Sequence, residues 1–268
     1  MNGEVLYIII ISVIFIIFAF KIINSKKRKL PYRTRKILEQ SLNIELDKAT
    51  EEEYTARAKE REKLKDYKGA LEDYDKALKI SAPDYEILFR RGIAKTKIND
   101  FTGAINDFTS AINLNPNEPF AYFARGLSYS HLKEFNEAIK DFSKAIERGL
   151  MEVSAFYHRG KCYVELNNFI EAKLDFQNYL NHKTESAEAN YYIGFCDYKL
   201  GNYEESIKKL DKCIELNPNH ESAYFYRAMC KKEFNDIDGC CKDLDLAMKK
   251  GYLMAYHYIK QYCKKDEN

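Results

Sequence analysis

The sequence predicts an all-α protein: a solenoid of about six helical hairpins, closed by one further helix and preceded by one transmembrane helix. Small and large apolar residues recur every 34 residues over most of the chain. Only 11 Gly and 5 Pro interrupt the 268 residues, which favours helices joined by short turns. A fixed period of this length is typical of stacked repeats. The third observation is an unbroken apolar run near the N-terminus.

The apolar run covers residues 5–20 without a charge, and two isoleucines extend it past Lys21. A helix over this stretch would span about 28 Å, close to the hydrocarbon thickness of a bilayer. A cleaved signal peptide would need basic residues before a shorter run and a small-residue cleavage site after it. None of these features is present. Residues 1–23 are therefore predicted to be a transmembrane anchor that contacts the bilayer through residues 5–23.

A basic linker is predicted over residues 24–50. Around its start the chain carries eight basic residues and no acid: Lys21, Lys26, Lys27, Arg28, Lys29, Arg33, Arg35 and Lys36. The positive-inside rule then predicts a single-pass membrane protein with its N-terminus outside and its repeats in the cytoplasm. All seven cysteines would lie in a reducing compartment, so no disulfide is expected.

Charge also bears on the partners. The formal net charge is +2, but the rest of the chain beyond the basic cluster is acidic, which argues against nucleic acid. Because the basic cluster adjoins the anchor, orientation and lipid contact are its expected roles.

Three series of residues define the 34-residue period. The first series consists of small residues: Ala70, Ala104, Ala138, Ala172, Ser206 and Cys240. The second is Ala58, Gly92, Gly126, Gly160, Gly194 and Ala228. The third is large and apolar: Tyr74, Phe108, Phe142, Phe176, Leu210 and Leu244. Small residues would let two amphipathic helices approach closely, and the large residues would fill the space beside them. Because one such unit cannot bury its apolar face alone, the units are expected to stack.

This pattern resembles the tetratricopeptide repeat, which places Gly at position 8, Ala at position 20, a large apolar residue at position 24 and often Pro at position 32. Pro116 and Pro218 fit the last position. Six units in register cover residues 51–252, and residues 253–268 follow as a capping helix and tail. Thr50 and Glu53 have the spacing of a capping box at the first helix. The resemblance implies a helical-hairpin solenoid that binds proteins or peptides.

An arginine occupies position 7 in five units, and an aspartate follows each arginine sixteen residues later. The arginines are Arg57, Arg91, Arg125, Arg159 and Arg227. The fifth unit lacks both members, with Ile193 and Lys209 in their places. Because the two series break together, we interpret them as ion pairs within each repeat rather than as a ligand site.

Cysteines replace small packed residues: Cys162, Cys196 and Cys230 share position 10, Cys213 stands where Ala77 stands, and Cys240 where Ala70 stands. No C-x-x-C motif is present, so structural packing is favoured over metal or redox chemistry. The vicinal pair Cys240–Cys241 leaves a redox role open. No metal and no cofactor is expected.

A second apolar stripe is the candidate binding groove. Position 5 carries Phe89, Phe123, Tyr157, Tyr191 and Phe225, and position 9 carries Ile93, Leu127, Lys161, Phe195 and Met229. In the tetratricopeptide family these positions face the concave surface, where an amphipathic helix or an extended peptide could dock. The alternative is that neighbouring first helices or the C-terminal helix cover these side chains. Family members that grip a peptide C-terminus need Lys at position 5 and Asn at position 9, which this chain lacks.

The predicted function is a membrane-anchored scaffold that recruits or organises proteins, without enzyme activity and without a small-molecule substrate. No nucleophile–base pair, glycine-rich loop or metal-ligand spacing is present in the sequence. A non-catalytic or regulatory subunit of a membrane enzyme or translocation complex is the alternative. The sequence identifies neither the partner nor the membrane.

Overall fold

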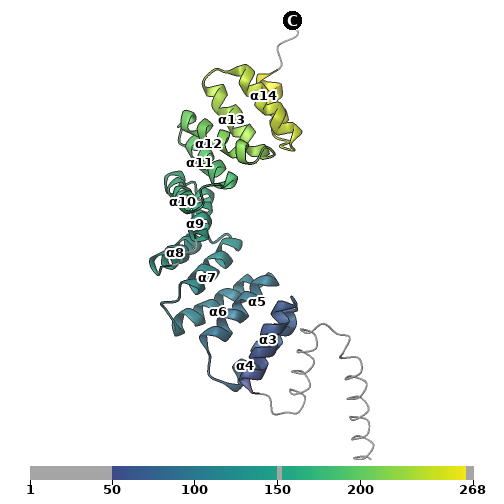
Figure 1. Ribbon diagram of the computed structural model, residues 1–268, viewed down its shortest axis with the longest axis vertical. Helices are drawn as coiled ribbons and strands as arrows, with labels where there is room; N and C mark the ends of the chain where they lie inside the picture. The colour runs from purple at the N-terminus through teal and green to yellow at the C-terminus, as the bar shows by residue number, and fades with distance from the viewer. Residues whose placement is uncertain (1–49, 150–152, 264–268) are drawn as a thin grey trace, which may run out of the picture. The chain divides into compact units, whose positions relative to one another are not determined.

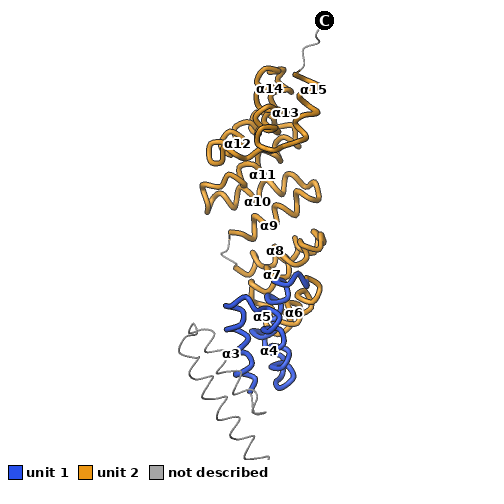
Figure 2. Tube along the Cα trace, turned by 90° about the vertical axis from the view of Figure 1, so that its right-hand side faces the viewer, with its two compact units in different colours: residues 1–100 blue, residues 101–268 orange. Residues whose placement is uncertain are grey.

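The computed structural model describes residues 50–149 and 153–263, and these residues form thirteen α-helices and no strand. Two compact units are present, residues 1–100 and 101–268 (Figure 2). The predicted anchor at 1–23 and all but the last residue of the linker at 24–50 lie outside the described residues. Within the described ranges, no helix has the length and apolarity that a membrane span requires.

The first unit contains α3 (Glu51–Lys63), α4 (Tyr67–Ile80) and α5 (Tyr85–Lys97). The predicted capping box is confirmed: Glu53 N donates to Thr50 Oγ1 at 3.3 Å, and Thr50 N donates to Glu53 Oε2 at 3.2 Å. Ala58, Ala70 and Tyr74 are fully buried between these helices.

The second unit holds the other ten helices, of which α6 to α14 are labelled in Figure 1. They are α6 (Phe101–Leu114), α7 (Pro119–His131), α8 (Phe135–Glu147), α9 (Ser154–Glu165), α10 (Phe169–His182), α11 (Ala187–Lys199), α12 (Tyr203–Leu216), α13 (Glu221–Glu233), α14 (Ile237–Lys249) and α15 (Ala255–Tyr262). From α6 onward each helix packs against the next, and the first helices of neighbouring repeats also meet, α7 with α9 and α11 with α13. This stacking is the packing that the repeat predicts.

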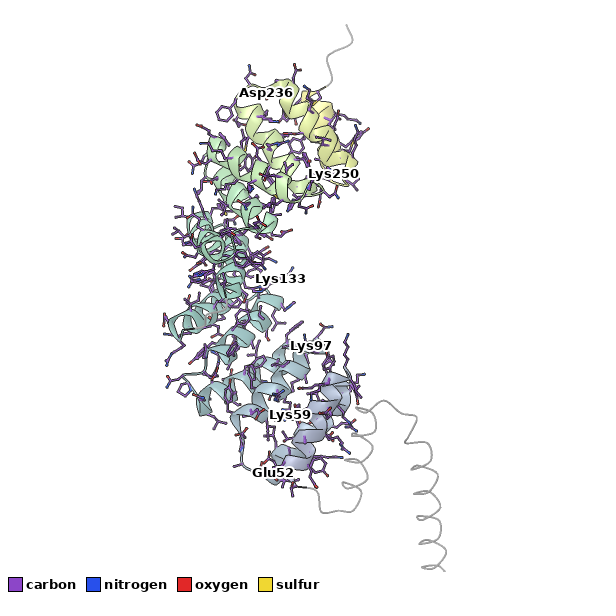
Figure 3. All side chains as sticks on the ribbon, viewed as in Figure 1. Glu52, Lys59, Lys97, Lys133, Asp236 and Lys250 are labelled. Carbon is purple, nitrogen blue, oxygen red and sulfur yellow. A yellow bond between two sulfur atoms is a disulfide. The ribbon has the colours of Figure 1, made fainter. Side chains whose placement is uncertain are left out.

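One residue in the turn within each repeat has a left-handed backbone conformation. Five of these residues are not glycine, and their φ angles lie between 59° and 63°: Lys65, Asn99, Lys133, Asn167 and Asn235. Lys133 is labelled in Figure 3. In the fifth repeat Gly201 takes this place with φ 80°. Asparagine and glycine tolerate this conformation best, so the turn composition follows from the backbone that the hairpin needs.

The core consists of the residues that the period predicts. The whole position-20 series from Ala70 to Cys240 is fully buried, and so is the position-24 series from Tyr74 to Leu244. A Cβ atom added to Gly160 would lie 3.1–3.2 Å from the ring of Phe176. Position 8 is therefore small because the large residue of position 24 fills the adjoining space.

At the C-terminal end, the predicted extra helix is confirmed as α15, which packs against α14. The expectation that no cysteine forms a disulfide is wrong for one pair. Cys241 on α14 and Cys263 at the end of α15 are bonded, with Cα atoms 5.6 Å apart. The expectation rested on the compartment alone, whereas α15 lies outside the repeat period and its return onto α14 brings the two cysteines together.

Candidate functional site: the aromatic face of the first helices

The arginine series forms ion pairs within repeats, as predicted. In the second unit Arg125, Arg159 and Arg227 each donate through Nε and Nη2 to both carboxylate oxygens of Asp141, Asp175 and Asp243, at 2.6–2.8 Å. Arg57 pairs with Asp73 in the first unit. The aspartates are almost fully buried, so removal of an arginine would leave a buried charge without its partner.

Arg125, Arg159 and Arg227 also reach the preceding repeat, which the sequence interpretation missed. Arg125 Nη1 donates to Thr109 Oγ1 at 3.0 Å, Arg159 Nη1 to Ser143 Oγ at 2.8 Å, and Arg227 Nη1 to Asp211 Oδ1 at 2.6 Å. These acceptors lie sixteen residues before the arginine, and the aspartates lie sixteen residues after it. The signal was therefore a second polar series at the same spacing.

The fifth repeat replaces this arrangement. Ile193 is fully buried against Ala172 and Phe176 of the fourth repeat. A salt bridge joins the same two repeats, with Lys173 Nζ 2.6 Å from Asp197 Oδ1. Arg91 pairs with Asp75 of the first repeat at 2.7 Å, so every arginine of the series binds a carboxylate of the scaffold.

The predicted groove residues of the first unit are Phe89 and Ile93 on α5, and both are partly buried. The ring of Phe89 stacks on that of Tyr85, with centroids 5.7 Å apart. This pair places an aromatic surface on the first helix of the second repeat.

In the second unit, Phe123 and Leu127 on α7 are partly buried and pack against Phe142 and Cys162. The ring centroid of Phe123 lies 5.7 Å from that of Phe142 and 5.8 Å from that of His158 on α9. One part of Phe123 therefore belongs to the core and another part remains accessible.

Tyr157 and Lys161 occupy the next first helix, α9. The ring of Tyr157 lies 5.7 Å from Phe176 and 6.0 Å from Tyr192 on α11. Burial raises the pKa of Tyr157, so its hydroxyl stays protonated. Lys161 is exposed, and its ammonium lies 5.8 Å from the Tyr157 ring centroid.

On α11, Tyr191 and Phe195 are partly buried. Phe195 contacts Tyr226 on α13 with ring centroids 4.9 Å apart, and Tyr191 contacts the same ring at 6.2 Å. The tyrosine and phenylalanine of this repeat thus continue the line of rings towards the sixth repeat.

On α13, Phe225 and Met229 are each only 5 % exposed. Phe225 lies 4.6 Å from Tyr252 and 5.1 Å from Tyr258, measured between ring centroids. For these two residues the alternative interpretation holds, because the C-terminal helix covers them. They cannot line an open groove while α15 is in place.

We call the position-5 and position-9 side chains of the second unit, together with His158, Tyr192 and Tyr226, the aromatic face. The last three residues occupy position 6 and connect neighbouring first helices, but the sequence interpretation did not include them. Burial lowers the pKa of His158 to about 4, so this histidine is neutral at pH 7. Adjacent aromatic residues at positions 5 and 6 were the signal for this second layer.

The described cysteines outside the disulfide are packed as predicted. Cys162, Cys196, Cys213, Cys230 and Cys240 are all buried. Burial raises the pKa of Cys196 to about 12, so its thiol is unreactive at pH 7. The described residues contain no group of three or more His, Cys, Asp or Glu side chains that could hold a metal ion.

Three segments match family models of the tetratricopeptide repeat: residues 54–84, 119–148 and 187–220. These segments fall within the first, third and fifth predicted units. No curated protein sequence matches the chain significantly.

Several solved structures share the fold. YrrB, described as a TPR protein with an unusual peptide-binding site, is 21 % identical with a TM-score of 0.64 over 70 % of this chain and 97 % of its own. The C-terminal part of a TPR repeat-containing protein from Cytophaga hutchinsonii is 17 % identical with a TM-score of 0.66, over 78 % and 87 %. MamA from Desulfovibrio magneticus is 15 % identical with a TM-score of 0.59, over 63 % and 97 %.

None of these matches indicates an enzyme family, and the matched tetratricopeptide repeats suggest a scaffold for interaction with proteins or peptides. The solved structures show the fold, and the three model matches support the assignment of this chain to the tetratricopeptide repeat family.

Proposed function

We propose that this protein is a membrane-anchored scaffold that recruits protein partners through the aromatic face. One observation supports this most strongly. Ring contacts connect four successive first helices, Phe123 to His158, Tyr157 to Tyr192, and Phe195 to Tyr226. From α7 to α11, the position-5 rings keep part of their surface exposed. A continuous, partly exposed aromatic surface is the kind of surface that binds an amphipathic helix or an extended peptide.

The membrane part of the proposal rests on the sequence. The apolar run at 5–23 would form the single-pass anchor, and the basic cluster after it would keep the repeats in the cytoplasm. The scaffold would then present its aromatic face to cytoplasmic proteins at a membrane surface.

A site-specific crosslinking experiment tests the aromatic face. A photoreactive residue replaces Lys161, which is exposed on this face, and in the matched control it replaces Lys144 on α8, whose side chain is 52 % exposed. In cells, the probe at position 161 should crosslink a defined partner protein that the probe at position 144 does not reach. Equal crosslinking from both positions would contradict the proposal.

A pair of variants then measures the binding energy. Phe123→Ala with Tyr157→Ala should weaken partner capture by about 2 kcal/mol or more, since central anchors dominate interfaces. Lys144→Ala with Arg148→Ala should change it little. Because both rings also pack against the core, the free energy of unfolding is measured beside capture. Lys161→Glu alters the aromatic face without removing a ring. If the double alanine variant unfolds, weaker capture by Lys161→Glu supports binding at this face, and unchanged capture contradicts it.

A further inference from the structure

The short helix α15 lies as a cover on the sixth repeat. Ala255 is fully buried, and Tyr258, Ile259 and Tyr262 pack on the cluster that contains Phe225 and Met229. Leu253 and Met254, which precede α15, are 82 % and 63 % exposed. Tyr256, which lies on α15 itself, is 54 % exposed. The contact of α15 with the repeats is therefore made by one side of a helix of eight residues.

The helix α15 has few features that stabilise it by itself. Met254 at its N-cap makes no side-chain cap hydrogen bond, and its first turn contains no acidic residue. Helices of this length are marginal in water without tertiary contacts. Its packing is also incomplete, because a pocket of about 310 Å³ is lined by residues of α11, α13 and α15, including Tyr198, Tyr226 and Tyr262.

One covalent bond holds the cover down. Cys263 at the C-terminal end of α15 is joined to Cys241 on α14, 22 residues earlier. Asp236 and Lys250, labelled in Figure 3, mark the two ends of α14. Both bonded cysteines are partly exposed, whereas the five free cysteines are buried. A small reductant can therefore reach this bond, while the buried thiols stay inert.

We propose that α15 is a redox-latched cover over the sixth-repeat part of the aromatic face. A reductant with two thiols would attack the Cys241–Cys263 bond and pass through a mixed disulfide. The products are two cysteine thiols in the protein and the disulfide of the reductant. A crosslink that closes a loop of this length lowers the population of states with α15 detached by a factor on the order of 100. Cleavage of the crosslink therefore favours release of α15.

Release would extend the binding surface. Phe225 and Met229 would become accessible and would continue the line from Tyr191 and Phe195. The covering helix shows which partner this surface fits. It presents Ala255, Tyr258, Ile259 and Tyr262 at spacings of three, four and seven residues, so the exposed surface fits a partner helix with a small residue, an aromatic, an aliphatic and an aromatic in that pattern.

The disulfide runs against what the cytoplasmic location predicted from the basic cluster would favour. Disulfides in reducing compartments are rare, and those that occur are usually catalytic or redox-sensing. The bonded state would then be the oxidised, closed form of the protein, and the reduced form would predominate in an unstressed cell.

Hydrogen exchange of the full chain in lipid nanodiscs tests the latch without any partner, so its outcome is independent of the proposed function. Dithiothreitol should raise amide exchange over 255–262 on the order of 100-fold and leave α6–α12 unchanged. Cys241→Ser should show this exchange without reductant and should not respond to it. Cys240→Ala is the matched control and should behave as wild type, since Ala70 and Ala138 occupy the same repeat position.

No change on reduction would overturn the proposal, because packing alone would then hold α15. A rise that spreads through α13 and α14 would also overturn it, since the bond would then stabilise the whole repeat. A second measurement addresses the surface itself. In Cys263→Ser, a peptide of residues 252–263 activated as a thiopyridyl disulfide should transfer to the Cys241 thiolate with release of thiopyridone. Transfer about 10-fold faster than from a scrambled peptide supports recognition of the helix pattern, and equal rates contradict it.

Discussion

Arg125 and Asp141 form a two-pronged ion pair between α7 and α8, with Nε 2.7 Å from Oδ2 and Nη2 2.8 Å from Oδ1. The third guanidinium nitrogen, Nη1, donates to Thr109 of the preceding repeat. Since Thr109 lies on α6, one side chain connects three helices. This geometry makes the pair a structural element of the repeat rather than a surface salt bridge.

We expect Arg125→Ala and Asp141→Ala each to destabilise the array, and the double variant to lose less than the sum. Either single change leaves a charged group in a site where the aspartate side chain is 7 % exposed and the arginine 18 %. The coupling energy should be about 1 kcal/mol or more, as for a partly buried pair. Urea unfolding of the four proteins in a double-mutant cycle measures it.

The exposed pair Glu137–Lys140 on the same helix is the control for this cycle, with side chains 46 % and 68 % exposed. Its coupling should not exceed about 0.5 kcal/mol. Strict additivity of Arg125→Ala and Asp141→Ala would show that the two side chains do not stabilise each other.

A histidine in the aromatic face should make stability depend on pH. Burial holds the pKa of His158 at about 4 in the folded protein, against an ordinary value of 6.5. Between these values the unfolded chain binds a proton that the folded chain does not, so stability falls as the pH falls from 6.5 towards 4. The loss from this residue should be about 2–3 kcal/mol by pH 4.5.

His158→Tyr removes this term, and tyrosine occupies the same position in the next two repeats as Tyr192 and Tyr226. Free energies of unfolding at pH 7 and pH 4.5 should differ less in the variant than in the wild type. Equal pH dependence in the two proteins would place the His158 ring in contact with water.

The close contact at Gly160 should penalise a methyl group there. Its Cβ would lie 3.1 Å from Phe176, whose ring is fully buried and stacked on Tyr192 at 4.7 Å. We expect Gly160→Ala to destabilise by about 1 kcal/mol despite its better helix propensity. In a Phe176→Ala background the same change should be neutral or stabilising, because the ring that the methyl group would meet is absent. Equal effects in both backgrounds, measured by urea unfolding, would refute this steric explanation.

The topology of the proposed anchor makes a further prediction. Protease added outside intact cells should leave residues 51–268 whole, because the basic cluster after the anchor places them in the cytoplasm. If the anchor lies in the bounding membrane of an organelle and the repeats face its interior, the protease is added outside intact organelles instead. Glycosylation or disulfide formation in the repeats would contradict the proposed orientation. The structure contains one such disulfide, Cys241–Cys263, so thiol labelling in untreated cells must find both cysteines reduced if the repeats are cytoplasmic.

Much of the fold could be predicted from the sequence because its information is periodic. The series from Ala70 to Cys240 and from Tyr74 to Leu244 identified the buried residues, since each position meets the same neighbours in every repeat. The joint loss of arginine and aspartate in the fifth unit predicts that the two series pair within repeats, because a pair between repeats would leave one partner unmatched. Periodic positions are predictable because each repeat in the stack makes the same contacts as the one before it.

The features that the period does not contain could not be predicted in the same way. Cys263 lies beyond the last repeat, so its approach to Cys241 depends on how α15 folds back. The same helix covers Phe225 and Met229, whereas Phe123 in an interior repeat remains partly exposed. Whether a given ring of the series is open thus depends on its position in the array, which a repeat pattern does not distinguish.

The buried Ile193 makes the junction between the fourth and fifth repeats differ from the others in its dependence on temperature. Elsewhere in the second unit, an arginine of the series links neighbouring repeats. Here Ile193 packs on Ala172 and Phe176 instead, and the charge-assisted link is the salt bridge between Lys173 and Asp197. Apolar contacts weaken on cooling, because their free energy comes from the surrounding water. On cooling, the junction between α10 and α11 should therefore depend more on the Lys173–Asp197 salt bridge, and without that bridge the chain would separate there into a segment that ends near residue 186 and a segment that begins at α11.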